Sequence, residues 1–246
     1  MTCVAIAAAH VLVPADRGVT VHAVLLAVTQ APTAPGADVV LVSAGFAASL
    51  TFAFWWLFGH TITLAHEGGH ALTTVLLGGV VDRLELRSDQ TGATWLATGP
   101  LRRLLVLVAG YTGPSLFGLG GALALRAGRA DLVLWGSVAL LLWALTVAGN
   151  WFGRLVIVAV GVTLFLFARS SSADVQAIAA CTWIWMLLVG GPIQSFEDRR
   201  HGSDHAKLRD ATLIPVAVWG FLFAAISLAA AATSALVLVG LVSLPA

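Results

Sequence analysis

The amino-acid sequence predicts an all-α polytopic membrane protein with about six transmembrane helices and a small β-hairpin between the first two spans. Of its 246 residues, 59% are hydrophobic and only 10% are charged, whereas about 25% of the residues in a soluble domain carry charge. Six apolar stretches are candidates to cross a hydrocarbon layer of about 30 Å, which needs roughly 20 residues. One short segment between the first two stretches alternates like a β-strand. Together these observations place most of the chain in a lipid bilayer.

The chain divides after residue 37 into an N-terminal segment and a membrane domain. Residues 1–37 hold two apolar runs that are each too short to span, and no run of positive charge precedes them as it would in a signal peptide. We therefore interpret this segment as peripheral or interfacial. The membrane domain, residues 38–246, holds the six predicted spans, which are approximately Val39–Leu64, Leu104–Leu125, Leu132–Ala148, Leu155–Ala168, Val175–Val189 and Leu213–Leu244.

Residues 80–98 have a different character and predict the hairpin. Alternate residues of the first half fall on one face of a strand, residues 88–92 are rich in turn formers, and residues 93–96 can return as a second strand. The residues of the shared face are Val80, Asp82, Leu84 and Leu86. An ordinary solvated loop is the alternative interpretation.

The strongest chemical signal is a histidine pair around a lone acid. Glu67 is the only charged residue between Asp38 and Asp82, and it lies between His66 and His70 in the string HEGGH. A buried carboxylate is costly in protein or in lipid, so its presence calls for a function. Two histidines four apart on a helix point to one face, and with the glutamate they form the HExxH zinc signature. We predict that both imidazoles bind zinc and that Glu67 is the catalytic base; hydrogen-bonded core histidines are the alternative.

The two glycines inside this string lower the stability of the predicted helix. Gly68 and Gly69 each weaken a helix interior by about 1 kcal/mol relative to alanine. We predict that they provide space for another helix or a substrate backbone to approach the metal.

A catalytic zinc usually has three protein ligands, so the histidines need a partner. Asp204 is the first candidate, because it is a carboxylate that follows a helix-starting pair near the last span; it could also serve as the helix N-cap. Asn150 is the rival, but a neutral amide is a poorer zinc ligand and suits a catalytic role in stabilising an oxyanion better. His201 and His205 could also bind metal, although each has the sequence setting of a solvated loop residue.

The lysines and arginines indicate an orientation. With the His70 end of the first span in the cytoplasm, nine basic residues fall in inside loops and four outside, as the positive-inside rule requires. The inside group is Arg83, Arg87, Arg102, Arg103, Arg154, Arg199, Arg200, Lys207 and Arg209, and the outside group is Arg17, Arg126, Arg129 and Arg169. The same orientation places the HEGGH string, the turn at Asn150 and the segment around Asp204 on one side, where they can form a single site.

Other features exclude some classes of function. The net charge of +1 and the lack of a basic tract make nucleic acid an unsuitable partner. Cys3 and Cys181 are far apart in apolar sequence, so we predict buried free thiols rather than a zinc or redox motif.

Several motifs, in order, resemble those of one family. Thr63 to Ala71 read T-x-x-HEGGHA, Ala109 to Pro114 read AGY-x-x-P, Asn150 to Gly153 form an N-x-x-G turn, and Ser203-Asp204-His205 precede Pro215. Residues 39–225 therefore resemble the site-2 protease type of intramembrane zinc metallopeptidase, and most closely its compact actinobacterial branch. The better-known members have an Asn…Asp-Gly stretch that supplies the third ligand, and the aspartate of that stretch is missing here.

The resemblance implies a zinc metallopeptidase of the cell membrane that cleaves membrane-spanning substrates near the cytoplasmic face. It implies that His66 and His70 bind zinc, that Glu67 is the base, and that the hairpin edge receives the substrate as an added strand. Its implied partners are a membrane-embedded protein or peptide substrate and the lipid bilayer. The alternatives are an inactive relative that binds or regulates transmembrane partners, against which the intact Glu67 argues, and a small transporter, which gives no reason for the two histidines.

Overall fold

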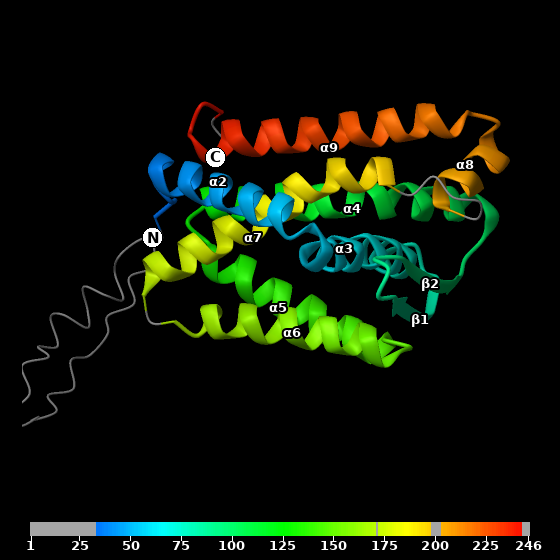
Figure 1. The fold of residues 1–246 in the computed structure, drawn as a ribbon, viewed down its shortest axis with the longest axis horizontal. Helices are drawn as coiled ribbons and strands as arrows, with labels where there is room; N and C mark the ends of the chain where they lie inside the picture. The colour runs from blue at the N-terminus through cyan, green and yellow to red at the C-terminus, as the bar shows by residue number, and fades with distance from the viewer. Residues whose placement is uncertain (1–32, 171, 198–202, 243–246) are drawn as a thin grey trace, which may run out of the picture. The chain divides into compact units, whose positions relative to one another are not determined.

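The computed structural model describes residues 33–170, 172–197 and 203–242. Residues 1–32 of the predicted N-terminal segment, which include Cys3, and His201 lie outside these ranges. The described elements are α2 (Ala37–Ala53), α3 (Trp55–Leu76), β1 (Val80–Leu86), β2 (Gly92–Ala97), α4 (Pro100–Arg126), α5 (Ala130–Val147), α6 (Trp151–Ala168), α7 (Ala173–Glu197), α8 (Asp204–Thr212) and α9 (Val216–Leu238) (Figure 1). The predicted helical fold with one hairpin is confirmed.

The described part of the chain is a multi-pass membrane protein. Five helices, α4, α5, α6, α7 and α9, are long and apolar enough to cross a bilayer. The helices α2 and α3 pass the same test only as a pair, and they are bent by 107° relative to each other. The count is thus five spans, or six if the bent pair crosses as one, which agrees with the prediction of about six.

The predicted first span, Val39–Leu64, is wrong as a single helix. The helix α2 ends at Ala53 and α3 begins at Trp55, while Phe54 between them has φ −125° and ψ 38°. The break lets each half follow a different partner, since α2 packs along α7 and α3 packs along α4. The side-chain amide of Gln90, at the hairpin tip, donates to the carbonyl of Trp55 at 3.1 Å and ties the tip to this bend. The HEGGH string consequently lies in the middle of α3.

The hairpin is antiparallel, and the described residues pair with one of its two outer edges. Val80 pairs with Ala97 at one end and Leu86 with Gly92 at the other, with a bulge between them. The outer edge of β1 is held by the segment before α6: the Gly149 amide donates to the Leu84 carbonyl at 2.7 Å. On the outer edge of β2, the described residues supply no further strand.

Close packing of α3 and α4 brings the HEGGH helix against its neighbour. A Cβ at Gly69 would collide with the Ala109 carbonyl oxygen, and one at Gly113 would lie 3.1 Å from the Ala65 carbonyl oxygen. The two backbones can therefore touch only because both positions are glycine. This confirms the predicted role of Gly69, whereas Gly68 has nothing within 4 Å and does not take part.

The pair of glycines yields a matched test of this contact. Gly69→Ala is expected to lower the free energy of unfolding by about 1–3 kcal/mol, because an added methyl group must force two close-packed backbones apart. Gly68→Ala should be neutral or should stabilise by up to about 1 kcal/mol, since alanine favours the helix. Thermal unfolding of both purified variants in the same detergent provides the measurement. Equal melting temperatures for the two would contradict the close contact.

Candidate metal centre

Three donor atoms from two distant parts of the chain converge inside the described bundle. His66 and His70, one turn apart on α3, bring their Nε2 atoms within 3.1 Å of each other. Oδ2 of Asp204, the first residue of α8, lies 2.7 Å from Nε2 of His70 and 3.3 Å from Nε2 of His66. Both histidines are buried, and these ligand atoms all lie within 4.8 Å of one another. The structure thus brings together the three residues that the sequence nominated as ligands.

The hydrogen-bond partner of His70 shows what this cluster can hold. Nδ1 of His70 faces the carbonyl oxygen of Val106 at 2.7 Å, and a carbonyl only accepts, so Nδ1 carries the hydrogen. The other ring nitrogen, Nε2, then faces His66 and Asp204. The ring of His66 lies edge-on to Tyr111, with the ring centroids 4.6 Å apart. Two imidazole nitrogens and a carboxylate oxygen face one another here, and either a proton or a cation between them offsets the repulsion of their lone pairs; the donor set fits a divalent metal.

The backbone of α4 is shaped to leave room for these rings. A Cβ at Gly110 would collide with the ring atoms of His70 and would lie 2.8 Å from Nε2 of His66. Only glycine allows α4 to pass so close to the donor atoms. The structure thereby explains why the AGY segment has a glycine at this point.

Asp204 is oriented by its own short helix. The hydroxyl oxygen of Ser203 accepts from the Ala206 amide, so Ser203 is the N-cap of α8 and the alternative that Asp204 is the cap is wrong. The Nζ of Lys207 donates to Oδ1 of Asp204 at 2.7 Å, which leaves Oδ2 for the histidines. Burial disfavours the charged carboxylate, but the adjacent His70 and His66 hold the pKa of Asp204 well below its usual range. The carboxylate is therefore ionised, the form that binds a metal.

Glu67 lies beside the cluster and is held by the hairpin. It is buried, and its Oε2 accepts a hydrogen bond of 2.6 Å from the hydroxyl of Thr94 in β2. A Cβ at Gly92, two residues earlier, would lie 2.5 Å from Oε1 of Glu67. Strand β2 therefore passes directly over the carboxylate, and the glycine makes this approach possible.

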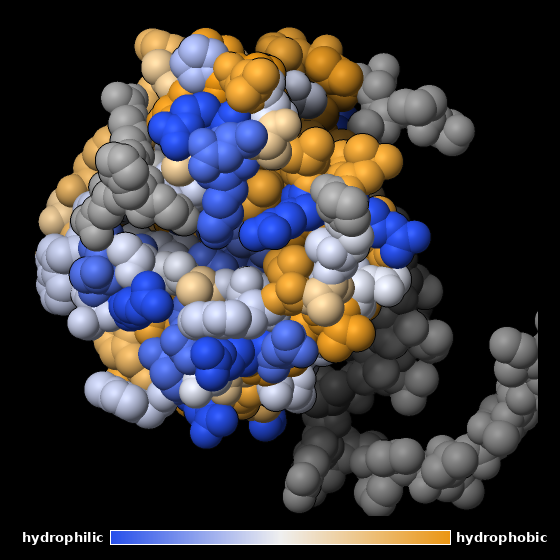
Figure 2. Space-filling model, turned by 90° about the vertical axis from the view of Figure 1, so that its right-hand side faces the viewer, coloured by the Kyte–Doolittle hydropathy of each residue, from blue (hydrophilic) through white to orange (hydrophobic). Residues whose placement is uncertain are grey.

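These residues open onto one recess of about 520 Å³. Its wall combines Glu67 and part of the donor cluster with β2 and the start of α4, and it includes Glu67, His70, Gly92, Thr94, Leu96, Val106 and Asp204. Figure 2 looks onto the end of the bundle where α8 and the hairpin lie, and hydrophilic residues gather across this face. The donor cluster is thus reached from a polar opening at the end of an otherwise apolar helical bundle.

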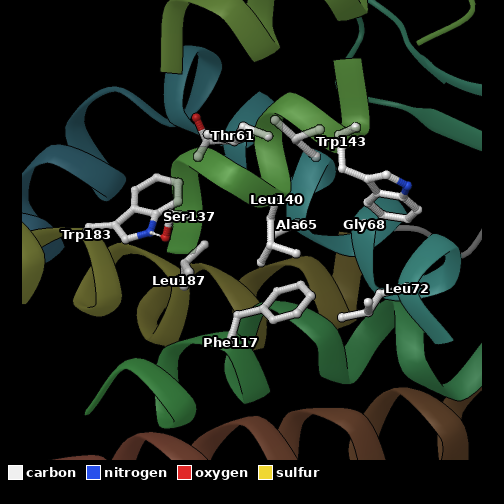
Figure 3. Close-up of a pocket in the computed structure, with 13 residues that line it drawn as sticks. Thr61, Ala65, Gly68, Leu72, Phe117, Ser137, Leu140, Trp143, Trp183 and Leu187 are labelled. Carbon is white, nitrogen blue, oxygen red and sulfur yellow. Dashed lines mark hydrogen bonds between the residues drawn. The ribbon is translucent and has the colours of Figure 1, made fainter. Parts of the chain in front are cut away.

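A second cavity, of about 90 Å³, lies on the opposite side of α3 (Figure 3). Ala65, Gly68 and Leu72 line it from α3, turned away from the two histidines. Its wall is almost wholly apolar, and the indole nitrogen of Trp183 donates to the Ser137 hydroxyl there at 3.0 Å. The cavity contains no titratable side chain among its lining residues, so the polar recess is the candidate reaction site.

Comparison with known proteins agrees with this geometry. The profile of the family described as Peptidase M50B-like matches residues 38–234. The chain belongs to this family. No curated protein and no solved structure matches the chain. The resemblance to site-2 proteases is thereby confirmed at the level of the peptidase family, and the M50B-like match covers every residue of the donor cluster.

Two residues nominated from the sequence have other surroundings in this M50B-like chain. Asn150 is the N-cap of α6: its Oδ1 accepts from the amides of Gly153 and Leu86, and its Nδ2 donates to the Leu86 carbonyl. It therefore clamps β1 to α6, while its catalytic role stays a prediction. His205 is fully buried, with its ring centroid 4.0 Å from that of Tyr111, so the interpretation as a solvated loop residue is wrong.

Sequence reasoning missed three residues that support the site. They are Thr94, which bonds Glu67, Lys207, which bonds Asp204, and Val106, whose carbonyl orients His70. Lys207 follows Asp204 by three residues on a helix, so i, i+3 spacing was the one available signal. The contacts of the other two exist only in the folded chain.

Metal binding by the cluster has a direct test. Asp204→Ala is expected to lower bound zinc well below one equivalent, because two imidazoles alone leave the cation short of a ligand. Asp210→Ala is the matched control, since Asp210 is also in α8 but is exposed and pairs with Arg209. Elemental analysis of both variants after dialysis against zinc provides the measurement. Equal zinc content in the two would remove Asp204 from the ligand set.

Proposed function

We propose that this protein is a zinc-dependent intramembrane endopeptidase that hydrolyses peptide bonds of membrane-spanning substrates near the cytoplasmic face. The observation that carries the proposal is the convergence of His66, His70 and Asp204 beside the buried acid Glu67, in a member of a peptidase family. The proposed cofactor is zinc, because nitrogen and carboxylate donors in a three-ligand set are typical of catalytic zinc sites.

The chain supplies three metal ligands and the residues that orient them. His66, His70 and Asp204 would hold the cation, which when bound supplies a Lewis acid that polarises the scissile carbonyl and acidifies water. The Val106 carbonyl keeps the His70 ring in the tautomer that ligation needs. Lys207 keeps one carboxylate oxygen of Asp204 occupied and so fixes the direction of the other.

Glu67 is the proton carrier of the proposed reaction. Its carboxylate would accept a proton from the attacking water and then donate it to the nitrogen of the leaving amine. The 2.6 Å bond from Thr94 occupies Oε2 and leaves Oε1 as the oxygen available to water. Thr94 is thus a positioning residue, which orients the base without touching the reacting atoms.

The free edge of β2 suits the capture of a substrate in extended form. Residues Gly92 to Leu96 line the same recess as Glu67 and His70, so a peptide added to this edge would lie along the donor cluster. A helical peptide bond has its carbonyl and amide engaged within the helix, and pairing with a strand edge supplies replacement hydrogen bonds as the helix unwinds. The basic residues around this end of the bundle support a cytoplasmic location for the opening.

The proposed role of Glu67 predicts a separation of metal binding from catalysis. Glu67→Gln is expected to keep zinc and to reduce cleavage of a single-span model peptide by at least about 100-fold, because an amide cannot accept the proton. The control is Glu85→Gln, since Glu85 lies in the hairpin and pairs with Arg83. Cleavage by the Glu67 variant at the parent rate would exclude this mechanism, as would undiminished cleavage after zinc is stripped by a chelator.

The orientation of Glu67 by Thr94 predicts a second, smaller effect. Thr94→Val removes the hydroxyl but keeps the β-branched shape of the side chain, and we expect kcat to fall about tenfold with KM nearly unchanged. Thr94→Ser restores the hydroxyl and should recover most of the parent kcat. A Ser variant as slow as the Val variant would show that side-chain packing, rather than the hydrogen bond, accounts for the loss.

A further inference from the structure

Two arginines on the wall of the catalytic recess have no acidic partner among the described residues. Arg87 and Arg103 both line the recess and are exposed. The neighbouring cations are all engaged: Arg83 lies near Glu85 and over the Trp95 ring, Arg102 donates to the Leu77 carbonyl, Arg209 pairs with Asp210, and Lys207 pairs with Asp204. Among the described residues, these two guanidinium groups therefore differ from the other basic side chains at this end of the bundle.

Their positions correspond to the two ends of β2. Arg87 directly follows β1, and its amide donates to the Thr91 carbonyl, next to Gly92 where β2 begins. Arg103 lies in the first turn of α4, six residues after β2 ends at Ala97. An extended peptide paired with the β2 edge would thus have a guanidinium near each end.

The electrostatics of the recess favour an anionic ligand. Arg103 lies in the first turn of a helix, where the helix dipole disfavours a cation by about 0.3–1 kcal/mol. Glu67 and Asp204 are the acids of the recess, and the proposed cation would offset their charge. Among the described residues, the arginines then remain without a compensating acid at the mouth, and an incoming carboxylate would relieve the repulsion.

We infer that Arg87 and Arg103 select substrates whose extended segment carries acidic side chains on both sides of the scissile bond. This inference rests on the proposed function, since it assigns the substrate class of the same recess. A peptide is favoured over an anionic lipid headgroup because both side chains line the recess that holds Glu67 and Asp204. Thr94 marks the level of the base, and each strand residue advances about 3.3 Å, so the acidic residues should lie within roughly four positions of the cleaved bond.

The test measures binding and cleavage separately in nanodiscs of phosphatidylcholine. The probes are fluorescent single-span peptides of about 20 Leu and Ala residues, followed by a flank that carries Glu, Gln or Lys at the same positions. Binding is measured to full-length Glu67→Gln protein, so that cleavage does not remove the probe. We expect the Glu flank to bind about fivefold more tightly than the Gln flank for each arginine that it engages, and added salt should weaken this preference.

Variants assign the preference to the two arginines. The double substitution Arg87→Gln with Arg103→Gln should abolish the Glu-over-Gln preference, and Arg103→Glu should shift preference toward the Lys flank. Arg209→Gln, which removes one guanidinium charge from α8 outside the recess, should leave the preference unchanged. A double variant that keeps the parent preference would overturn the inference.

Two further arms separate the possible explanations. If the double variant alters only the response to added phosphatidylglycerol and not the flank preference, the arginines bind lipid headgroups and the inference is wrong. Cleavage by protein with intact Glu67 tests the proposed function independently. Zinc-dependent cleavage at equal kcat/KM for all flanks supports the peptidase but overturns the selectivity, whereas flank-selective binding without any cleavage supports the acidic-segment site and contradicts the peptidase.

Discussion

The site depends on one constraint: two imidazoles and the carboxylates of Asp204 and Glu67 must meet inside a bundle that is otherwise apolar. Each of these groups would be costly to bury alone. Together they can share a cation, and the close passage of α4 along α3 keeps other groups out of the space between them. The glycines at 69, 110 and 113 permit that passage, because a side chain at any of them would meet backbone or ring atoms. The chemistry of the site is therefore built on the spacing of two helices.

The short helix α8 holds Asp204, which is far from the two histidines in the sequence, in a fixed position beside them. Leu208 of α8 packs in a buried cluster with Leu107, Tyr111 and Phe223, which belong to α4 and α9. Ser203 caps the helix start, so the first residue, Asp204, leaves the helix in a fixed direction toward α3. The same aromatic cluster supports the ring of His66 through Tyr111. One apolar anchor thus positions two of the three donor atoms.

Local patterns in the sequence were sufficient to predict part of this arrangement. The spacing of His66, Glu67 and His70 is a property of one helix, and alternation together with the turn-forming residues 88–92 located the hairpin. Asp204 is 138 residues from His66, and only its charge and its expected side of the membrane made it a candidate. The break at Phe54 has no proline or glycine to announce it, because it reflects which helices the two halves contact. The Thr94 bond to Glu67 likewise depends on how the hairpin folds back over α3.

The sealed side of the hairpin has a consequence for turnover. Since β1 is occupied by the segment that ends at Asn150, the described sheet has one edge, that of β2, with backbone donors and acceptors not paired to a further strand. In the proposed mechanism only one peptide could pair with that edge at a time, so a cleaved product still paired with β2 would block the next substrate. Release of the spent fragment, as much as the hydrolytic event, would then set the pace of successive cycles.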